Sequence, residues 1–371
     1  MNYYTLPKNN HVLDFFPQIQ EDAVSIHTTF SLLKCYKKLL EQIDIKNVTS
    51  FFQLANPYEY IFSNIPEINT TISKLSVTDC VFYDLYEIFT YLNFFENFTT
   101  NMNAFYISKN LNDILICHNL FRADYNDTII SSESIDDTIT DVKIYNFDFI
   151  FYEIKNNDNN INNDVNQYTV QLLQILRIIL LNQKNNGNCI IKIEHMIYKP
   201  IIDIIYIFCS LYEKVSIIKP TTSNITNFEK YIVCSKFILN EEKKASYNNY
   251  IIKMDLFLSK FLSCNSNKNI SSILSNSIPC FFLNRIDDIN IIFGQQQLET
   301  IDHLINMFKN KNKDEKLELL KKANIQKSIN WCEKYKIPYN KIIDKPNIFL
   351  PLKKNNKIAD EEVEPEPDVF I

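Results

Sequence analysis

The sequence predicts an α/β fold, with a mostly parallel sheet between flanking helices and a helical C-terminal extension. Between residues 147 and 237, short apolar runs alternate with helical patterns. Such alternation is typical of a parallel sheet whose strands are joined by helices. Charged residues also stand inside or at the end of three neighbouring runs, and Lys192 lies within an isoleucine-rich one. Because lysine is almost never buried without a partner, Lys192 requires a carboxylate or a function.

The remaining elements follow from periodicity. Apolar residues recur at steps of three and four through 22–43, which predicts a helix that also carries Lys34, Lys37 and Lys38. The strands that we expect lie at 48–54, 103–108, 147–153, 189–193 and 228–233. The other helices that we expect lie at 61–65, 167–181, 250–262 and 298–320, with one more between 193 and 219.

Four regions follow from these patterns. Residues 1–21 form an irregular aromatic arm, and residues 22–240 form the α/β domain. Residues 241–350 form the helical extension, and residues 351–371 form an acidic, proline-containing tail without a packed core.

Composition excludes several classes of protein. The formal net charge of −6 argues against non-specific clamping of nucleic acid by bulk charge. Nine cysteines occur without a CxxC pair or metal-ligand spacing, so we expect reduced thiols, a cytoplasmic protein and no metal site. The first residues lack a secretory pattern, and the apolar runs are too short or too interrupted to span a bilayer, so no membrane partner is expected. Only two glycines occur in a chain rich in asparagine, isoleucine and lysine, which indicates an AT-rich coding sequence.

Two stretches carry a resemblance to a known family. Asn186-Gly187-Asn188-Cys189-Ile190-Ile191-Lys192 is similar to a turn and strand that ends in a catalytic lysine. Lys219-Pro220-Thr221-Thr222-Ser223, followed by Phe228-Glu229-Lys230-Tyr231-Ile232-Val233, is similar to a "KP..SR..S.E.Y.V" signature. Both belong to the FtsJ-like, Rossmann-fold RNA ribose 2′-O-methyltransferases, and the chain resembles their divergent members in large DNA viruses.

The resemblance implies a catalytic tetrad. That family places a Lys-Asp-Lys-Glu set on its sheet, and Lys192 and Glu229 match the last two members. Lys34 stands one helix before the expected first strand, where the first lysine belongs, with Lys37 and Lys38 as competitors. Glu153 stands where the family has aspartate.

The same resemblance implies S-adenosylmethionine as cofactor and RNA, most naturally a capped mRNA, as substrate. The family's first loop is glycine-rich, and here Asn56-Pro57-Tyr58 keeps the proline but lacks the glycines that follow it. Asp124 stands in a loop that resembles the adenine-contacting one. We therefore expect Asn56, Pro57, Tyr58 and Asp124 to line the cofactor site.

The chemistry explains why these residue types belong together. A ribose hydroxyl is a poor nucleophile, and a lysine serves as its base only if burial and a second cation lower the lysine pKa. Lys34 would supply that cation, and Glu153 and Glu229 would hold both ammonium groups. The plainer interpretation of the Lys192–Glu229 pair is a buried structural ion pair.

Three functions remain open at this point. The first is an S-adenosylmethionine-dependent 2′-O-methyltransferase of the mRNA cap. The second is an inactive subunit of the same fold that binds RNA or a partner in a capping or transcription complex, and the substituted loop 56–60 favours it. The third is a structural virion protein. For a viral protein, the viral factory or the virion are further locations.

Overall fold

The computed structural model describes most of the chain. The described residues are 1–9, 13–20, 30–43, 48–77, 79–96, 98–135, 146–154, 161–194, 196–239, 241–263, 268–309 and 313–340. The acidic tail predicted at 351–371 lies outside them.

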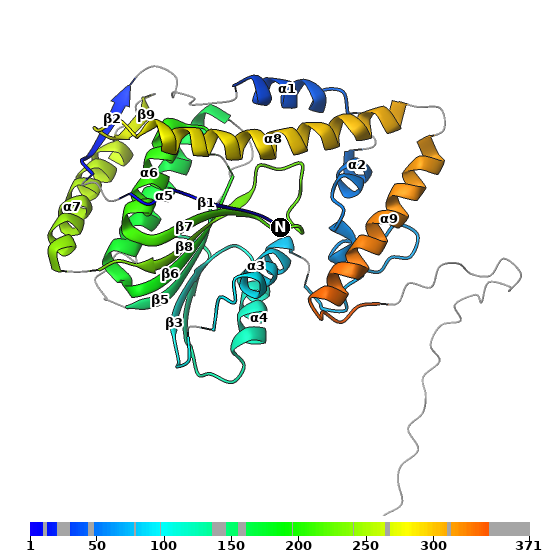
Figure 1. Ribbon diagram of the computed structural model, residues 1–371, viewed down its shortest axis with the longest axis horizontal. Coiled ribbons are helices and arrows are strands. Elements are labelled where there is room, and N and C mark those ends of the chain that lie inside the picture. The colour runs from blue at the N-terminus through cyan, green and yellow to red at the C-terminus, as the bar shows by residue number, and fades with distance from the viewer. Residues whose placement is uncertain are drawn as a thin grey trace, which may run out of the picture.

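A seven-stranded sheet organises the described residues, with the strand order β1-β7-β8-β6-β5-β3-β4 (Figure 1). Its strands are β1 (Asn2–Thr5), β3 (Asn103–Ile107), β4 (Thr128–Ser132), β5 (Phe147–Glu153), β6 (Gln183–Ile193), β7 (Tyr212–Lys219) and β8 (Lys230–Phe237). From β4 to β6 all pairs are parallel, whereas β8 is antiparallel to both β6 and β7, and β1 is antiparallel to β7. All but β1 and β8 therefore run the same way, which confirms the mostly parallel sheet.

Helices cover both faces of this sheet. Those before β7 are α1 (Phe30–Leu40), α2 (Val48–Ala55), α3 (Cys80–Tyr91), α4 (Leu111–Arg122), α5 (Ile161–Asn182) and α6 (Lys199–Leu211). Those after β8 are α7 (Glu241–Ser263), α8 (Cys280–Lys309) and α9 (Lys313–Lys334). Their flanking positions confirm the predicted α/β class.

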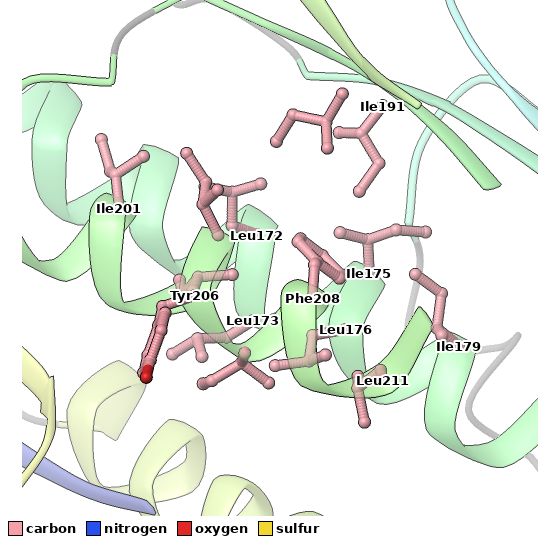
Figure 2. Close-up of a cluster of buried hydrophobic side chains, with 14 of the residues drawn as sticks. Leu172, Leu173, Ile175, Leu176, Ile179, Ile191, Ile201, Tyr206, Phe208 and Leu211 are labelled. Atoms are coloured by element: carbon pink, nitrogen blue, oxygen red, sulfur yellow. The ribbon is translucent and has the colours of Figure 1, made fainter. Parts of the chain in front are cut away.

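Two apolar cores result, one on each side of the sheet. On one side, α5 and α6 pack against inward-facing strand residues, and Figure 2 shows Leu172 and Ile175 of α5 beside Phe208 of α6 and Ile191 of β6. On the other side, aromatic residues of α3 pack against β3 and β5 and against Trp331 of α9. Because both faces are covered, the strands are apolar almost throughout, as expected for a parallel sheet.

The strand order reverses beside β3. The chain passes outward from β3 to β4 and then returns to place β5 on the other side of β3. Ligands of open α/β sheets bind outside the carboxyl ends of the strands at such a reversal. A ligand site is therefore expected in the crevice between the carboxyl ends of β3 and β5.

The strand expected at 48–54 is not present. Residues 48–54, expected as the first strand, belong to α2, where Phe51 and Ala55 lie one turn apart and pack against α8. Short aromatic and β-branched runs do not separate strand from helix by periodicity alone. The first strand of the parallel set is β3 instead.

The arm and the extension also differ from expectation. The arm contains two strands, because β1 joins the main sheet and β2 (Phe15–Gln20) pairs with β9 (Asn269–Leu274). The helix expected at 298–320 divides between α8 and α9. The strands of the arm arise from pairing with distant strands, which local periodicity does not record.

No described helix combines the length and apolarity needed to cross a membrane.

Candidate active site

Lys192 lies between two carboxylates at the carboxyl end of β6. Its Nζ donates to Glu153 Oε1 at 3.0 Å and lies 3.5 Å from Glu229 Oε1. The three side chains are only 11%, 15% and 19% exposed, respectively. Three of the four residues of the predicted tetrad are therefore together.

Strand register explains this meeting. Glu153 is paired with Lys192 across the parallel β5/β6 ladder, so both side chains leave the sheet on the same side. Lys192 is also paired with Tyr231 across the antiparallel β6/β8 ladder. Tyr231 follows Glu229 by two residues, so this pairing brings Glu229 close to Lys192. Residues far apart in the chain thus converge where three strands meet.

The charge of Lys192 is fixed by these neighbours. Burial acts to lower the pKa of Lys192, but the carboxylates of Glu229 and Glu153 outweigh it and raise that pKa well above the usual value. Lys192 is therefore an ammonium group at neutral pH. The expectation of a lysine with a lowered pKa was wrong, because the neighbouring charges are negative.

Lys34, the fourth predicted member, lies elsewhere. It is an exposed residue of α1 and forms no ion pair with Glu153 or Glu229. Its helix does approach the site, since Tyr36 donates to the backbone oxygen of Thr226 at 2.7 Å and packs against Phe228. The competitors Lys37 and Lys38 are also exposed.

The crevice beside Lys192 is narrow. Ser108, the residue that follows β3, donates from its hydroxyl to Glu153 Oε2 at 2.5 Å and accepts from the backbone N–H of Asn110. The hydrogen bond from Ser108 to Glu153 joins the ends of β3 and β5. The cavity that remains is about 160 Å³ and is lined by Lys109, Glu153, Ile154, Lys192, Ile193, Glu194 and Glu229.

Helix α3 contributes buried carboxylates that the sequence analysis did not find. Asp84 is fully buried and accepts from the hydroxyls of Thr222, Ser223 and Tyr231 at 2.5, 2.7 and 2.9 Å. Burial raises the pKa of Asp84 to about 7, against the lowering effect of these donors and of Lys192. Asp84 thus binds both β8 and the loop of residues 220–229, called the 220s loop below, next to Lys192.

Glu87, one turn later, binds the same loop. Its Oε2 accepts from the backbone N–H and hydroxyl of Thr221 at 3.0 and 2.7 Å, and from Nε1 of Trp331 at 3.3 Å. Two acidic residues three positions apart in an aromatic helix are the sequence signal that could have indicated this arrangement, because carboxylates are seldom buried without donors.

Two further lysines are buried near the site. Lys219 Nζ donates to the backbone oxygen of Asn227 at 2.5 Å, and Lys230 Nζ donates to that of Glu194 at 2.9 Å. Burial lowers the pKa of Lys219 to about 8. Burial and the charge of Lys219 lower the pKa of Lys230 to about 7.

The four residues predicted for the cofactor site do not adjoin Lys192. Asn56 is buried after α2, where its amide donates to Glu59 Oε2 at 3.0 Å, and Pro57 and Tyr58 line a second cavity. Asp124 is exposed after α4, in the loop that enters the amino end of β4, at the opposite edge of the sheet. Asn56, Pro57 and Tyr58 follow a helix because the strand expected at 48–54 is α2. The residues that follow β3 at the reversal of the strand order are Ser108, Lys109 and Asn110.

Among the described residues, no group of three or more histidine, cysteine, aspartate or glutamate side chains is placed to hold a metal ion.

Comparison with known proteins gives relatives at low identity. No family model matches the chain. The chain is 28% identical over 144 residues to a cap-specific mRNA (nucleoside-2′-O-)-methyltransferase 2 from Pongo abelii, which covers 38% of this chain and 18% of the relative. It is 26% identical over 133 residues to a cap-specific mRNA (nucleoside-2′-O-)-methyltransferase 1 from Drosophila melanogaster, with coverage of 35% and 16%.

A solved structure of a putative ribosomal RNA methyltransferase from Plasmodium falciparum superposes with a TM-score of 0.34 and 16% identity, over 43% of this chain and 98% of that one. The chain spans less than a fifth of the length of the two curated relatives. The sequence matches support the resemblance to RNA methyltransferases, and they do not address a viral origin.

Proposed function

We propose that the chain is an RNA ribose 2′-O-methyltransferase that acts on capped mRNA. The observation that carries the proposal is the Lys192 ammonium held by Glu153 and Glu229 at the reversal of the strand order. The named activity of the two curated relatives supports it.

The residues define what this site does to a ribose. As an ammonium group, Lys192 donates a hydrogen bond to the 2′-oxygen and orients the hydroxyl, while Glu153 or Glu229 accepts the hydroxyl proton. Both carboxylates already contact Lys192, so the acceptor geometry exists before RNA binds. Such positioning supplies a large part of the rate of an in-line displacement.

The resemblance to RNA methyltransferases implies S-adenosylmethionine, and the residue types at the reversal fit its polar groups. Lys109 and the amino end of α4, whose first residue follows Asn110, suit the carboxylate of an amino acid. Glu153 suits hydroxyl and amino groups, which donate hydrogen bonds to a carboxylate. When bound, this cofactor would supply the methyl group.

The second candidate function is a catalytically inactive subunit that binds RNA or a partner in a capping complex. The hydrogen bond from Ser108 to Glu153 favours it, because this bond spans the crevice that the cofactor would enter. The cavity of about 160 Å³ is also smaller than the roughly 300–1,000 Å³ of typical small-molecule sites. Cofactor binding therefore requires Ser108 and Glu153 to separate.

Titration calorimetry with S-adenosylmethionine, together with transfer of a labelled methyl group to capped RNA, distinguishes the two. For an enzyme we expect a heat of binding and methyl transfer, and Lys192→Met should reduce transfer at least a hundredfold, within the range of acid–base contributions. Absence of both signals at millimolar cofactor, with RNA binding retained, would establish the inactive subunit. Ser108→Ala then tests the closed crevice, since removal of the hydroxyl should strengthen cofactor binding.

The same proposal includes the partners, which are RNA and a capping or transcription complex. It also includes a viral origin and a location in the cytoplasm, the viral factory or the virion.

A further inference from the structure

A second cavity, also of about 160 Å³, lies along the same edge of the sheet as the Lys192 site. Its lining comes from the turn after α2, the loop after β7, the start of β1 and one face of α8. The residues are Met1, Asn2, Pro57, Tyr58, Lys219, Pro220, Thr221, Ser223, Ile225 and Gln296. It shares no lining residue with the cavity beside Lys192.

The cavity is adjacent to the Lys192 site along the sheet. Lys219 ends β7, and β7 runs parallel to β6 with β8 between them. Strands are about 4.8 Å apart, so the ends of β6 and β7 are separated by roughly 10 Å. A neighbouring nucleotide of a single strand covers that interval.

The lining suits a flat, mostly apolar ring. Pro57, Tyr58, Pro220 and Ile225 offer ring and aliphatic surfaces on which a base can stack. Asn2 donates from its side-chain amide to Gln296 Oε1 at 3.1 Å. Each amide carries more donors and acceptors than this bond uses, which suits the edge of a base.

Most polar groups of the lining already have partners within the protein. The hydroxyls of Thr221 and Ser223 are donated to Glu87 and Asp84, and Lys219 donates to a backbone oxygen. Burial and the negative charge of Glu87 raise the pKa of Tyr58, so its hydroxyl stays neutral. The amino group of Met1 lies 3.8 Å from Glu87 Oε1, so these two charges offset each other. The apolar surfaces of the lining, and not a net charge, therefore favour a base in this cavity.

We propose that this cavity binds a nucleobase of the RNA strand whose ribose lies at Lys192. The inference rests on the proposed function, because it requires that the chain binds RNA. It assigns Tyr58 and Gln296 to substrate binding, and it separates Tyr58 from the cofactor role that the sequence predicted.

The test is a thermodynamic double-mutant cycle, in which one change is a protein substitution and the other is a modified nucleotide of the RNA. A labelled, capped single strand of about ten nucleotides, within the usual site sizes, is titrated by fluorescence anisotropy. Versions with one abasic nucleotide at successive positions locate the base that matters. Tyr58→Ala should weaken binding of the intact strand about tenfold, as loss of one stacked base does. The critical abasic strand should bind wild type about tenfold more weakly and bind Tyr58→Ala no more weakly than the intact strand does.

Matched variants control the result. Tyr125→Ala removes a partly exposed tyrosine at the opposite edge of the sheet, and Gln295→Ala removes an exposed glutamine next to Gln296, so both should leave affinity unchanged. Tyr58→Phe retains the ring and should bind within about twofold of wild type, which also checks that the position folds normally.

The outcomes separate the two proposals. If wild type binds RNA but Tyr58→Ala binds equally well, or if every abasic penalty persists in Tyr58→Ala, the nucleobase inference is wrong and the proposed function stands. If Tyr58→Ala loses affinity for S-adenosylmethionine and not for RNA, the cavity belongs to the cofactor. If wild type does not bind RNA, both proposals fall.

Discussion

Three lysines with little solvent exposure lie at the same end of the sheet, and the surroundings of Lys192 differ from those of Lys219 and Lys230. Lys192 contacts two carboxylates, which keep its pKa high. Lys219 and Lys230 donate to backbone oxygens, and burial lowers their pKa values to about 8 and about 7. The side chain that keeps a positive charge at neutral pH is therefore Lys192.

The lowered pKa of Lys230 predicts a pH dependence of stability. In the unfolded chain a lysine has a pKa of about 10.4. Between pH 7 and that value, the unfolded state binds a proton that the folded state lacks, so the free energy of unfolding rises with pH. A change from the usual pKa to about 7 corresponds to roughly 5 kcal/mol over the whole window. Lys230→Met should abolish most of this rise.

Urea denaturation at intervals from pH 7 upward measures the rise. Lys219, with its pKa of about 8, should leave a smaller residual slope in Lys230→Met. Lys322→Met, which removes an exposed lysine of α9, should retain the slope of wild type. An equal slope in Lys230→Met and wild type would show that Lys230 keeps its proton in the folded state.

At the scale of elements, α3 connects the site to the C-terminal helices. Asp84 and Glu87 hold three consecutive hydroxyl residues of the 220s loop, and Trp331 of α9 donates to the same Glu87 oxygen. The loop leads directly to Glu229. The geometry around Lys192 therefore depends on a helix that starts more than a hundred residues later in the chain.

Trp331→Phe tests this connection. The change retains an aromatic ring but removes the Nε1–H donor, and we expect a loss of about 1–2 kcal/mol because a buried carboxylate loses one donor. Glu87→Gln should cost a similar amount, and the double variant should cost less than the sum of the two. Urea denaturation of the three variants gives the coupling. Additive losses would show that Trp331 stabilises α9 without acting through Glu87.

The sequence predicted the second half of the sheet better than the first. The strands at 147–153 and 189–193 and their helix were confirmed because long apolar runs and a periodic helix mark them plainly. Their register placed Glu153 beside Lys192, as the resemblance implied. The first strand was misplaced because 48–54 is short and aromatic, and Asn56, Pro57 and Tyr58 therefore follow a helix and not a strand.

The partners of the buried α3 carboxylates were beyond sequence reasoning for a different reason. Asp84 and Glu87 reach their partners across 134 or more positions of the chain. Neither a propensity nor a spacing rule encodes such contacts. Lys34 shows the converse, since its place in the chain fits the family but its side chain is exposed on α1.

At the scale of the whole molecule, the C-terminal region is part of the α/β core. Helix α6 is apolar on nearly all sides, so it needs cover on the face turned away from the sheet. Strand β9 and helix α8 supply that cover, with Ile270, Ile273, Phe282 and Ile286 buried in the same core as α6. On this view the boundary expected at 240 does not separate two folding units.

A shortened chain tests whether the region after residue 240 is needed for the α/β core to fold. Removal of residues 241–371 would expose the outer face of α6 and would strip β2 of its only partner among the described strands. It would also remove two hydrogen bonds that α8 donates to the site, from Asn290 to the oxygen of Met196 at 3.0 Å and from Gln297 to that of Asn227 at 2.7 Å. We therefore expect the 1–240 chain to aggregate, or to bind an apolar dye without a cooperative melting transition.

The matched control is the chain that ends at residue 340, which retains every helix and strand described above. It should elute as a folded protein and melt as the full chain does. Size-exclusion chromatography, dye fluorescence and thermal melting by circular dichroism compare the three chains. A monomeric 1–240 chain with a sharp transition would mean that the sheet carries its own core. In that case, the contacts of α8 with the oxygens of Met196 and Asn227 would serve the site and not the fold.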